Sequence, residues 1–220
     1  MRIDIWSDVI CPFCYIGKAN LEKALADSGT PTELVHHAFR LMPGDAPYPV
    51  EQMFARRYGQ GPEQAAQSLR NVESTAAAAG LEFHLSSTLC GDTTDAHKLL
   101  ALAGDRGVQA ALLDRLYRAY FTQGRNVFDR DVLRELAADG GLDSVEISAA
   151  FDSAELTRRV AADQAKAQSL KVRGVPYFII DNRVAVSGAQ PVSAFAEALS
   201  FVTAADAAVC GPNTCDPAQK

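Results

Sequence analysis

Cys11 and Cys14, near the start of the chain, are separated by two residues and are the first candidates for chemistry. The segment before them, Arg2 to Ser7, alternates like a strand, and the apolar residues from Pro12 to about Asp27 follow a helical period. Cys11 is therefore expected where a strand passes into a helix. The unpaired N–H groups and the positive dipole at a helix start favour a thiolate, so Cys11 is predicted to be a nucleophile.

Cys14 lies one turn further along the same predicted helix, within reach of the Cys11 sulfur and more sheltered by the helix. It is predicted to attack Cys11 in a mixed disulfide and so release the substrate thiol. The alternative is half of a zinc site, which needs a second close pair of ligands. The other cysteine pair, Cys210 and Cys215, is spaced too widely for an ordinary zinc knuckle, so no metal site is expected.

Val175 and Pro176 follow Gly174 and lead into an apolar run, Tyr177 to Ile180, that has the pattern of a strand. A proline at the start of a strand is tolerated in any sheet and, taken alone, would indicate no more than that. Together with an N-terminal CxxC pair, it matches the position where thioredoxin-fold enzymes have a cis-proline loop facing the active-site sulfurs.

Patterns typical of strands occur at both ends of the chain. A second strand is predicted from Glu33 to Leu41, and near the other end a turn at Asp181-Asn182 predicts a hairpin. Between about Pro49 and Lys171 the composition favours helices, broken at glycines. The predicted architecture is an α/β domain assembled from both termini and interrupted by a large all-helical insertion. The expected division is 1–42 and 172–203 for the α/β domain, 43–171 for the insertion, and 204–220 for a tail after a last helix that ends near 202.

With these features in place, the segment SDVICPFCYIG (residues 7–17), the helical block and the segment GVPYF (residues 174–178) together resemble the DsbA family of thiol–disulfide oxidoreductases, in its FrnE-like branch. The resemblance covers about residues 1–203. It implies a thioredoxin-like fold with an inserted helical domain, a redox-active Cys11/Cys14 pair and a cis Pro176 beside it. No cofactor is expected for this chemistry.

The sequence departs from the family pattern at two positions. Strongly oxidising DsbA-type sites have a histidine between the cysteines, whereas Phe13 can neither donate a hydrogen bond nor add charge, so a less oxidising disulfide is expected. The buried acid six residues before the first cysteine is replaced by Ile5. Asp8 could take its place or could be an exposed carboxylate that caps the loop. The residues expected to tune the pair or bind substrate are Pro12, Phe13, Val175 and Asp8.

Cys210 and Cys215 bracket the turn-forming residues Gly-Pro-Asn in the tail. They are predicted to be an auxiliary redox pair, with a structural clip as the alternative, because a bridge closing so short a loop would add little stability. Cys90 is expected to be an unpaired thiol. His36 and His37 alternate along the second strand, so one is expected to be packed and the other solvated. No motif places the remaining histidines and their acidic neighbours at metal-ligand spacing (His84, His97, Asp92, Asp95).

The composition is that of a globular protein, with 220 residues, 48% hydrophobic and 22% charged. A formal charge of −6 would repel a phosphate backbone, which excludes nucleic acid as a partner. No run approaches the ~18 apolar residues of a membrane span and no secretory leader is evident, so no membrane partner and a cytoplasmic location are expected. Paired cysteines in the cytosol are more often catalytic, redox-sensing or metal-binding than structural.

These observations predict a thiol–disulfide oxidoreductase or disulfide isomerase that acts through the CPFC pair on protein or small-thiol substrates and is recycled by an unknown thiol redox partner. The first alternative is a glutathione-dependent isomerase or transferase on the same fold. Such relatives carry a lone serine or cysteine nucleophile, whereas both cysteines are present here. The second alternative is a protein that binds a thiophilic metal through the two cysteine pairs.

Overall fold

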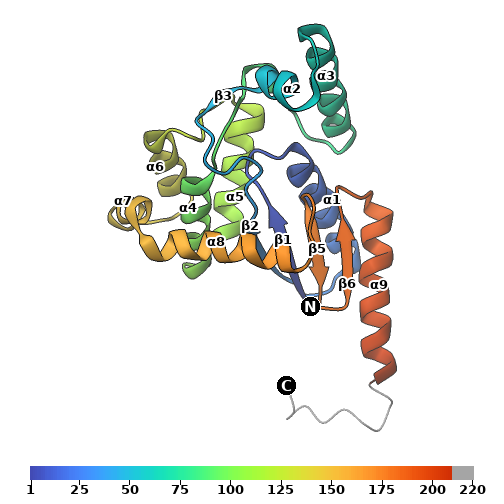
Figure 1. Ribbon diagram of the computed structural model, residues 1–220. Coiled ribbons are helices and arrows are strands. Elements are labelled where there is room, and N and C mark those ends of the chain that lie inside the picture. The colour runs from blue at the N-terminus through green and yellow to red at the C-terminus, as the bar shows by residue number, and fades with distance from the viewer. Residues whose placement is uncertain (210–220) are drawn as a thin grey trace.

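The computed structural model describes the backbone of residues 1–209 and the side chains through Ala204. A four-stranded sheet is built from both ends of the chain in the order β2-β1-β5-β6 (Figure 1). β1 pairs in parallel with β2 and antiparallel with β5, and β5 pairs antiparallel with β6. The strands are β1 (Arg2–Ser7), β2 (Glu33–Ala38), β5 (Tyr177–Ile180) and β6 (Val184–Ser187). This mixed sheet between helices confirms the predicted α/β fold.

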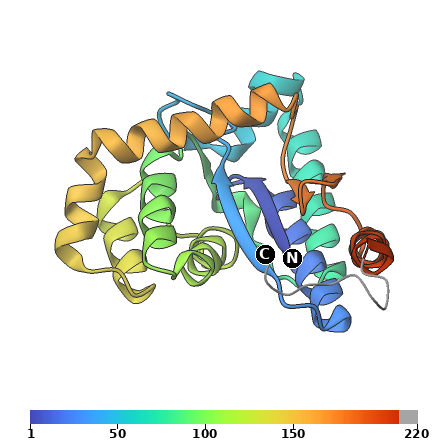
Figure 2. The same ribbon diagram turned by 90° about the horizontal axis from the view of Figure 1, so that it is seen from below.

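Helices cover both faces of the sheet because successive side chains of a strand point to opposite sides. Ile3 and Ile5 of β1 pack on one side with Phe178 and with helices α1 (Pro12–Ser28) and α9 (Val192–Val209). Trp6 packs on the other side with Ala167 of helix α8 (Ala154–Ser169). Figure 2 shows α8 crossing one face of the sheet while α1 and α9 lie against the other.

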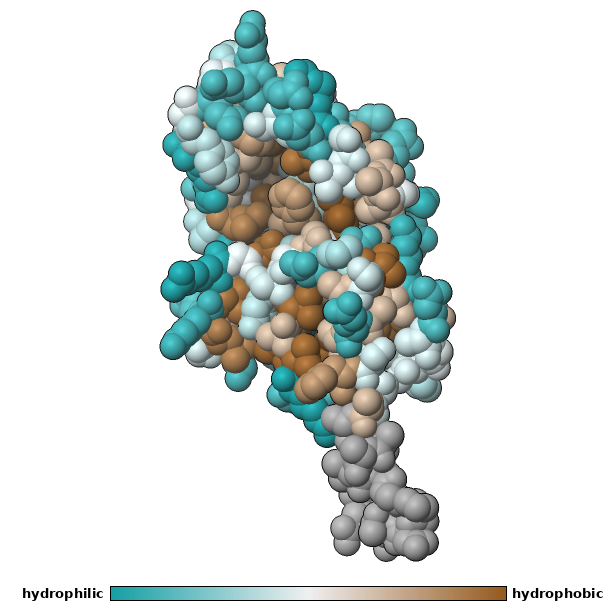
Figure 3. All heavy atoms as spheres, turned by 90° about the vertical axis from the view of Figure 1, so that its right-hand side faces the viewer, coloured by the Kyte–Doolittle hydropathy of each residue, from teal (hydrophilic) through white to brown (hydrophobic). Residues whose placement is uncertain are grey.

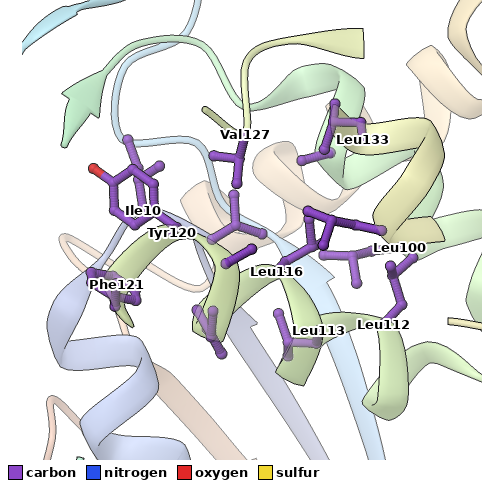
Figure 4. Packing of buried hydrophobic residues seen from close by; sticks show 14 of the residues in the cluster. Ile10, Leu100, Leu112, Leu113, Leu116, Tyr120, Phe121, Val127 and Leu133 are labelled. Carbon is purple, nitrogen blue, oxygen red and sulfur yellow. The ribbon is translucent and has the colours of Figure 1, made fainter. Parts of the chain in front are cut away.

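The middle of the chain is helical, and its core continues into the cysteine segment. Val9, Ile10, Cys11 and Cys14 belong to the same buried cluster as the apolar side chains of this region. Figure 4 shows Ile10 close to Tyr120, Phe121 and Val127 in this cluster. The helices are α2 (Val50–Tyr58), α3 (Pro62–Ala78), α4 (Thr94–Asp105), α5 (Gln109–Tyr117), which continues as a π-helical turn η2 (Arg118–Thr122), α6 (Arg130–Asp139) and α7 (Ser144–Asp152).

Four features differ from the predicted elements. A short 3₁₀ turn η1 (Leu85–Ser87) and a two-residue ladder between β3 (Tyr48–Pro49) and β4 (Leu89–Cys90) were not expected. β2 ends at Ala38 rather than Leu41. Two residues further on, the backbone amide of Arg40 donates to the side chain of Gln164 at 2.7 Å and not to a neighbouring strand. α9 continues to Val209 through residues 204–209, which were expected to lie in the tail, because the alanines there favour a helix.

The division of the chain into an α/β domain and an inserted helical domain at 42/43 and 171/172 stays a prediction. Within the described part of the chain, every helix is too short or too polar to cross a lipid bilayer.

Candidate active site

The two cysteines lie where β1 passes into α1. Cys11 is the N-cap of the helix, with extended backbone angles (φ −86°, ψ 111°), and Pro12 occupies the first turn. The Cys11 amide donates to the Asp8 carbonyl at 3.1 Å, and the Cys14 amide donates to the Cys11 carbonyl at 3.0 Å. Cys11 therefore stands at the positive end of the helix, as the sequence predicted.

Val175 and Pro176 reach this helix start from the other end of the chain. The Val175–Pro176 peptide bond is cis, as the resemblance implied. The Cys11 thiol lies 3.6 Å from the Val175 carbonyl oxygen, to which its S–H donates. The fold therefore brings residues more than 160 positions apart to one sulfur atom.

Both thiols are reduced and shielded, with 4% of Cys11 and 2% of Cys14 exposed. Burial raises the pKa of the Cys14 thiol well above its ordinary value, and Cys11, when it is a thiolate, raises it further through its hydrogen bond and negative charge. The backbone of Asp8 opposes this shift, whereas the charge of its carboxylate adds to it. Cys14 is therefore held as a neutral thiol, and it must lose its proton when it attacks.

Asp8 is fully buried, so the alternative of an exposed loop-capping carboxylate is wrong. Its Oδ2 accepts a hydrogen bond from the Leu41 amide at 2.7 Å. Its Oδ1 lies 3.4 Å from His97 Nε2 and has no hydrogen-bond partner among the described residues. Ile5, which stands where the family has its buried acid, packs in the apolar core beneath α1.

His97 and Tyr117 are two site residues that the sequence did not reveal. Tyr117 is buried on α5, and its ring stacks on Tyr15 of α1 with centroids 4.7 Å apart. Burial raises the pKa of the Tyr117 phenol, and a negative charge on Cys14 or Cys11, when either is a thiolate, raises it further, which places the phenol near both sulfurs. No local pattern could have found either residue, because each comes from a helix about ninety residues or more away along the chain.

The surface beside the cysteines offers apolar and basic contacts. Phe13 is 43% exposed at the start of α1. A cavity of about 390 Å³ lies along the cis-proline loop, and its lining includes Lys171, Arg173 and Tyr177 as well as Val175 and Pro176. Figure 3 shows hydrophobic residues gathered in a hollow between the part formed by α2 and α3 and the part that carries the sheet and α9.

The remaining candidates take no part in the arrangement of the two thiols and the cis-proline loop, or they lie outside the described residues. Cys90 is a free, buried thiol on β4, and burial raises its pKa to about 11. His36 is packed as expected, and burial lowers its pKa to about 3. His37 is not simply solvated, because it bonds Asp4 and Asp163 and stacks on Trp6. Cys210 and Cys215 lie outside the described residues.

The described residues contain no group of three or more histidine, cysteine or acidic side chains that could hold a metal ion.

Comparison with known proteins agrees with this geometry. The family model for a DSBA-like thioredoxin domain matches residues 2–200. The crystal structure of a probable DsbA oxidoreductase from Streptomyces coelicolor is 40% identical, with a TM-score of 0.88 over 98% of this chain and 94% of that one. A curated relative, the uncharacterized protein YwbO of Bacillus subtilis, is 28% identical over 91% of this chain and 96% of its own length.

A more distant structure shares the fold. The cytosolic disulfide reductase DsbM from Pseudomonas aeruginosa, solved with GSH, is 21% identical, with a TM-score of 0.66 over 93% of this chain and 100% of that one.

Proposed function

Because this chain belongs to the DSBA-like thioredoxin-domain family and is a disulfide oxidoreductase of that family, we propose that it exchanges disulfides with protein or small-thiol substrates through Cys11 and Cys14. One observation carries the proposal. The Cys11 sulfur lies at a helix start, against the Val175 carbonyl of a cis-proline loop, with a second thiol one turn behind it.

The reaction proceeds in two displacements. The Cys11 thiolate attacks one sulfur of a substrate disulfide, so that a Cys11–substrate bond forms and the other substrate sulfur leaves as a thiolate. Cys14 then loses its proton and attacks Cys11, forming the Cys11–Cys14 disulfide and releasing the first substrate sulfur. The substrate gains two electrons and the enzyme loses two, which a thiol redox partner returns. The reverse sequence delivers a disulfide to a dithiol.

The neighbouring residues tune the pair and receive the substrate. Phe13 gives the Cys11 thiolate neither a hydrogen bond nor a charge, which favours a less oxidising disulfide than a histidine would. Pro12 fixes the first turn of α1, and Val175 positions the sulfur through its carbonyl oxygen. A substrate chain lies along the cis-proline loop and meets the exposed Phe13 ring.

Three finer assignments complete the proposal. We assign the chain to the FrnE-like branch, on the segments 7–17 and 174–178, and place it in the cytoplasm. Cys210 and Cys215 act as an auxiliary redox pair. The glutathione-dependent alternative is less well supported, because a resolving thiol is present at Cys14.

The test replaces each thiol in turn and follows insulin reduction and adduct mass. Cys11→Ser should abolish turnover, and Cys14→Ser should accumulate a mixed disulfide on Cys11, because the second displacement is lost. Cys90→Ser is the matched control and should leave turnover unchanged, since neither displacement uses the Cys90 thiol. Full turnover by Cys14→Ser would instead assign the chain to single-thiol, glutathione-dependent chemistry.

A further inference from the structure

A cavity of about 550 Å³ lies along the free edge of β2, between α4, α5 and α8. Its polar lining includes Ser7, His36, His97 and Gln109. Other lining residues, such as Gly104 and Ala110, are exposed, so solvent can enter the cavity. Two lining residues adjoin Asp8, since Ser7 precedes it in the chain and His97 meets it through space.

Asp8 and His97 form a buried polar pair whose facing atoms are both unpartnered. Asp8 is 0% exposed and His97 is 3% exposed. Asp8 Oδ1 and His97 Nε2 are 3.4 Å apart, and neither has a hydrogen bond within the described part of the chain. Buried polar atoms normally have hydrogen-bond partners, because an atom left without one loses the hydrogen bonds that water gave it in the unfolded chain. A proton placed between Asp8 Oδ1 and His97 Nε2 would give both atoms a hydrogen-bond partner.

The proposed second displacement needs a route for one proton. Cys14 is buried, and its pKa is raised, so its proton cannot pass directly to bulk solvent. The carboxylate of Asp8 is near enough for its charge to act on that thiol. Asp8 is itself closed off from the surface, and a proton that it accepts must leave through a neighbour.

We propose that His97 is a positioning residue that relays the proton of Cys14 from Asp8 to solvent in the β2-edge cavity. This inference rests on the proposed function. As the Cys14 sulfur bonds to Cys11 and the substrate sulfur departs, the thiol proton passes to Asp8. Asp8 passes it to His97 Nε2, and the resulting imidazolium releases a proton to water in the cavity. The departing substrate thiolate takes its own proton from solvent, and in the reverse reaction each transfer is reversed.

The test uses a full-length protein in which Cys90, Cys210 and Cys215 are serine. Its reduced form is mixed with dithiobis(nitrobenzoate), and release of the coloured thiolate is followed by stopped flow. Attack by Cys11 releases the first equivalent and attack by Cys14 releases the second. His97→Gln keeps an N–H donor toward Asp8 but cannot take up and release a proton. It should slow the second phase about 10- to 100-fold and leave the first within about twofold.

Chemical rescue separates a relay from a merely structural role. In His97→Ala, imidazole that enters the cavity should restore the second phase in proportion to its concentration, with little effect on the parent protein. His36→Gln is the matched control, because His36 lines the same cavity, is also buried, and its ring nitrogens form no hydrogen bond with Asp8 or any other described residue. It should leave both phases unchanged.

A second phase at the parent rate in His97→Gln would overturn the relay, and so would a slow phase in His97→Ala that imidazole does not restore. Failure of the proposed function has a different signature, since the parent protein would then release the first equivalent and no second one.

Discussion

Gly17 controls how closely the cis-proline loop approaches the cysteine helix. A Cβ atom at this position would lie 2.9 Å from Pro176 Cγ, 3.2 Å from Phe178 Cζ and 3.4 Å from the Cα of Ala189. The first distance is too short for any side chain, and the ring of Pro176 cannot move without shifting the loop. The absence of a side chain at Gly17 therefore sets the distance between α1 and the loop whose carbonyl meets the Cys11 sulfur.

Gly17→Ala should lower the free energy of unfolding by about 1–3 kcal/mol, because the loop must move to make room. The cost of moving the loop outweighs the gain of about 1 kcal/mol that alanine brings to a helix interior. It should also slow the reaction of Cys11 with a disulfide probe. Urea denaturation and stopped-flow thiol kinetics measure the two effects.

Gly174→Ala is the control for this substitution, since a Cβ there meets no atom within 4 Å. It should leave both measurements near wild type. A Gly17→Ala protein with native stability and native thiol kinetics would show that the loop tolerates displacement.

At the residue scale, the sequence predicted the groups whose roles depend on local structure. The place of Cys11, Pro12 and Cys14 at a helix start could be predicted from the change of a strand pattern into a helix pattern. The cis-proline was predicted from the family resemblance. The surroundings of Asp8 could not be predicted, because its burial depends on Leu41 and on His97, which reach it from distant segments. Spacing along a chain carries no signal for such contacts.

At the element scale, side chains from helices close the free edge of β2. Gln109 of α5 accepts from the His36 amide and donates to the His36 carbonyl, which imitates a neighbouring strand. Asp163 of α8 accepts from the Ala38 amide at 2.9 Å. An open strand edge invites pairing with other chains, so these contacts protect the sheet while leaving the cavity beside it.

His37 ties β2 to α8 and to β1. Its ring nitrogens lie 2.9 Å from Asp163 Oδ1 and 2.7 Å from Asp4 Oδ1. Burial lowers the pKa of His37, but the hydrogen bonds to Asp163 and Asp4 outweigh it, and the pKa is raised above its ordinary value. The charged ring therefore stabilises the fold fully below about pH 6.5, its unfolded pKa, and loses that contribution as the pH rises through the raised pKa.

His37→Gln should destabilise the protein by about 1–2 kcal/mol near pH 6 and by less above the raised pKa of the folded state. Chemical denaturation across this range measures the difference from wild type. His84→Gln, at an exposed pair with Glu82, is the control and should change stability little at any pH. If the difference in stability between His37→Gln and wild type stays constant with pH, the neutral ring stabilises the fold as well as the charged ring does.

The helical block between about Pro49 and Lys171 could be predicted because a helix-favouring composition and the glycines that interrupt it are local signals. Asp129, Asp143 and Ser153 accept hydrogen bonds at the starts of α6, α7 and α8, where capping residues are expected. The ladder between β3 and β4 could not be predicted, because its two-residue strands are held by pairing across forty positions rather than by a periodic pattern. The continuation of α9 past 202 could not be predicted, because small and polar residues are typical of a tail as well as of a helix end.

At the scale of the whole molecule, the active site and the end of α9 lie at opposite ends of the sheet layer. α1 begins at the cysteines, and Figure 1 shows α9 running away from that end of the sheet. Ala189, just before α9, lies next to Gly17 of α1. Gly17 is about one and a half helical turns along α1 from Cys11, in the direction away from the active site. The helix from Val192 to Val209 then descends roughly 25 Å further.

This geometry determines how the predicted tail pair could exchange with the active site. Cys215 follows Val209 by six residues, and a fully extended segment of that length spans at most about 21 Å. Cys210 reaches a far shorter distance. Neither sulfur can return to Cys11 of the same chain while α9 is intact, so exchange between the Cys210/Cys215 disulfide and the Cys11/Cys14 dithiol should take place between two molecules.

The rate of that exchange should therefore rise in proportion to protein concentration. Mixing the reduced Cys210→Ser/Cys215→Ser variant with an oxidised-tail Cys11→Ser/Cys14→Ser variant isolates the step, and mass spectrometry of quenched samples follows it. The wild-type chain should show no faster exchange than this mixture at equal concentration. The two pairs are linked in one chain, but α9 keeps them too far apart for that link to raise the rate at which they meet. A concentration-independent exchange in the wild-type chain would require the end of α9 to unwind, and transfer in neither experiment would reduce Cys210 and Cys215 to a structural clip.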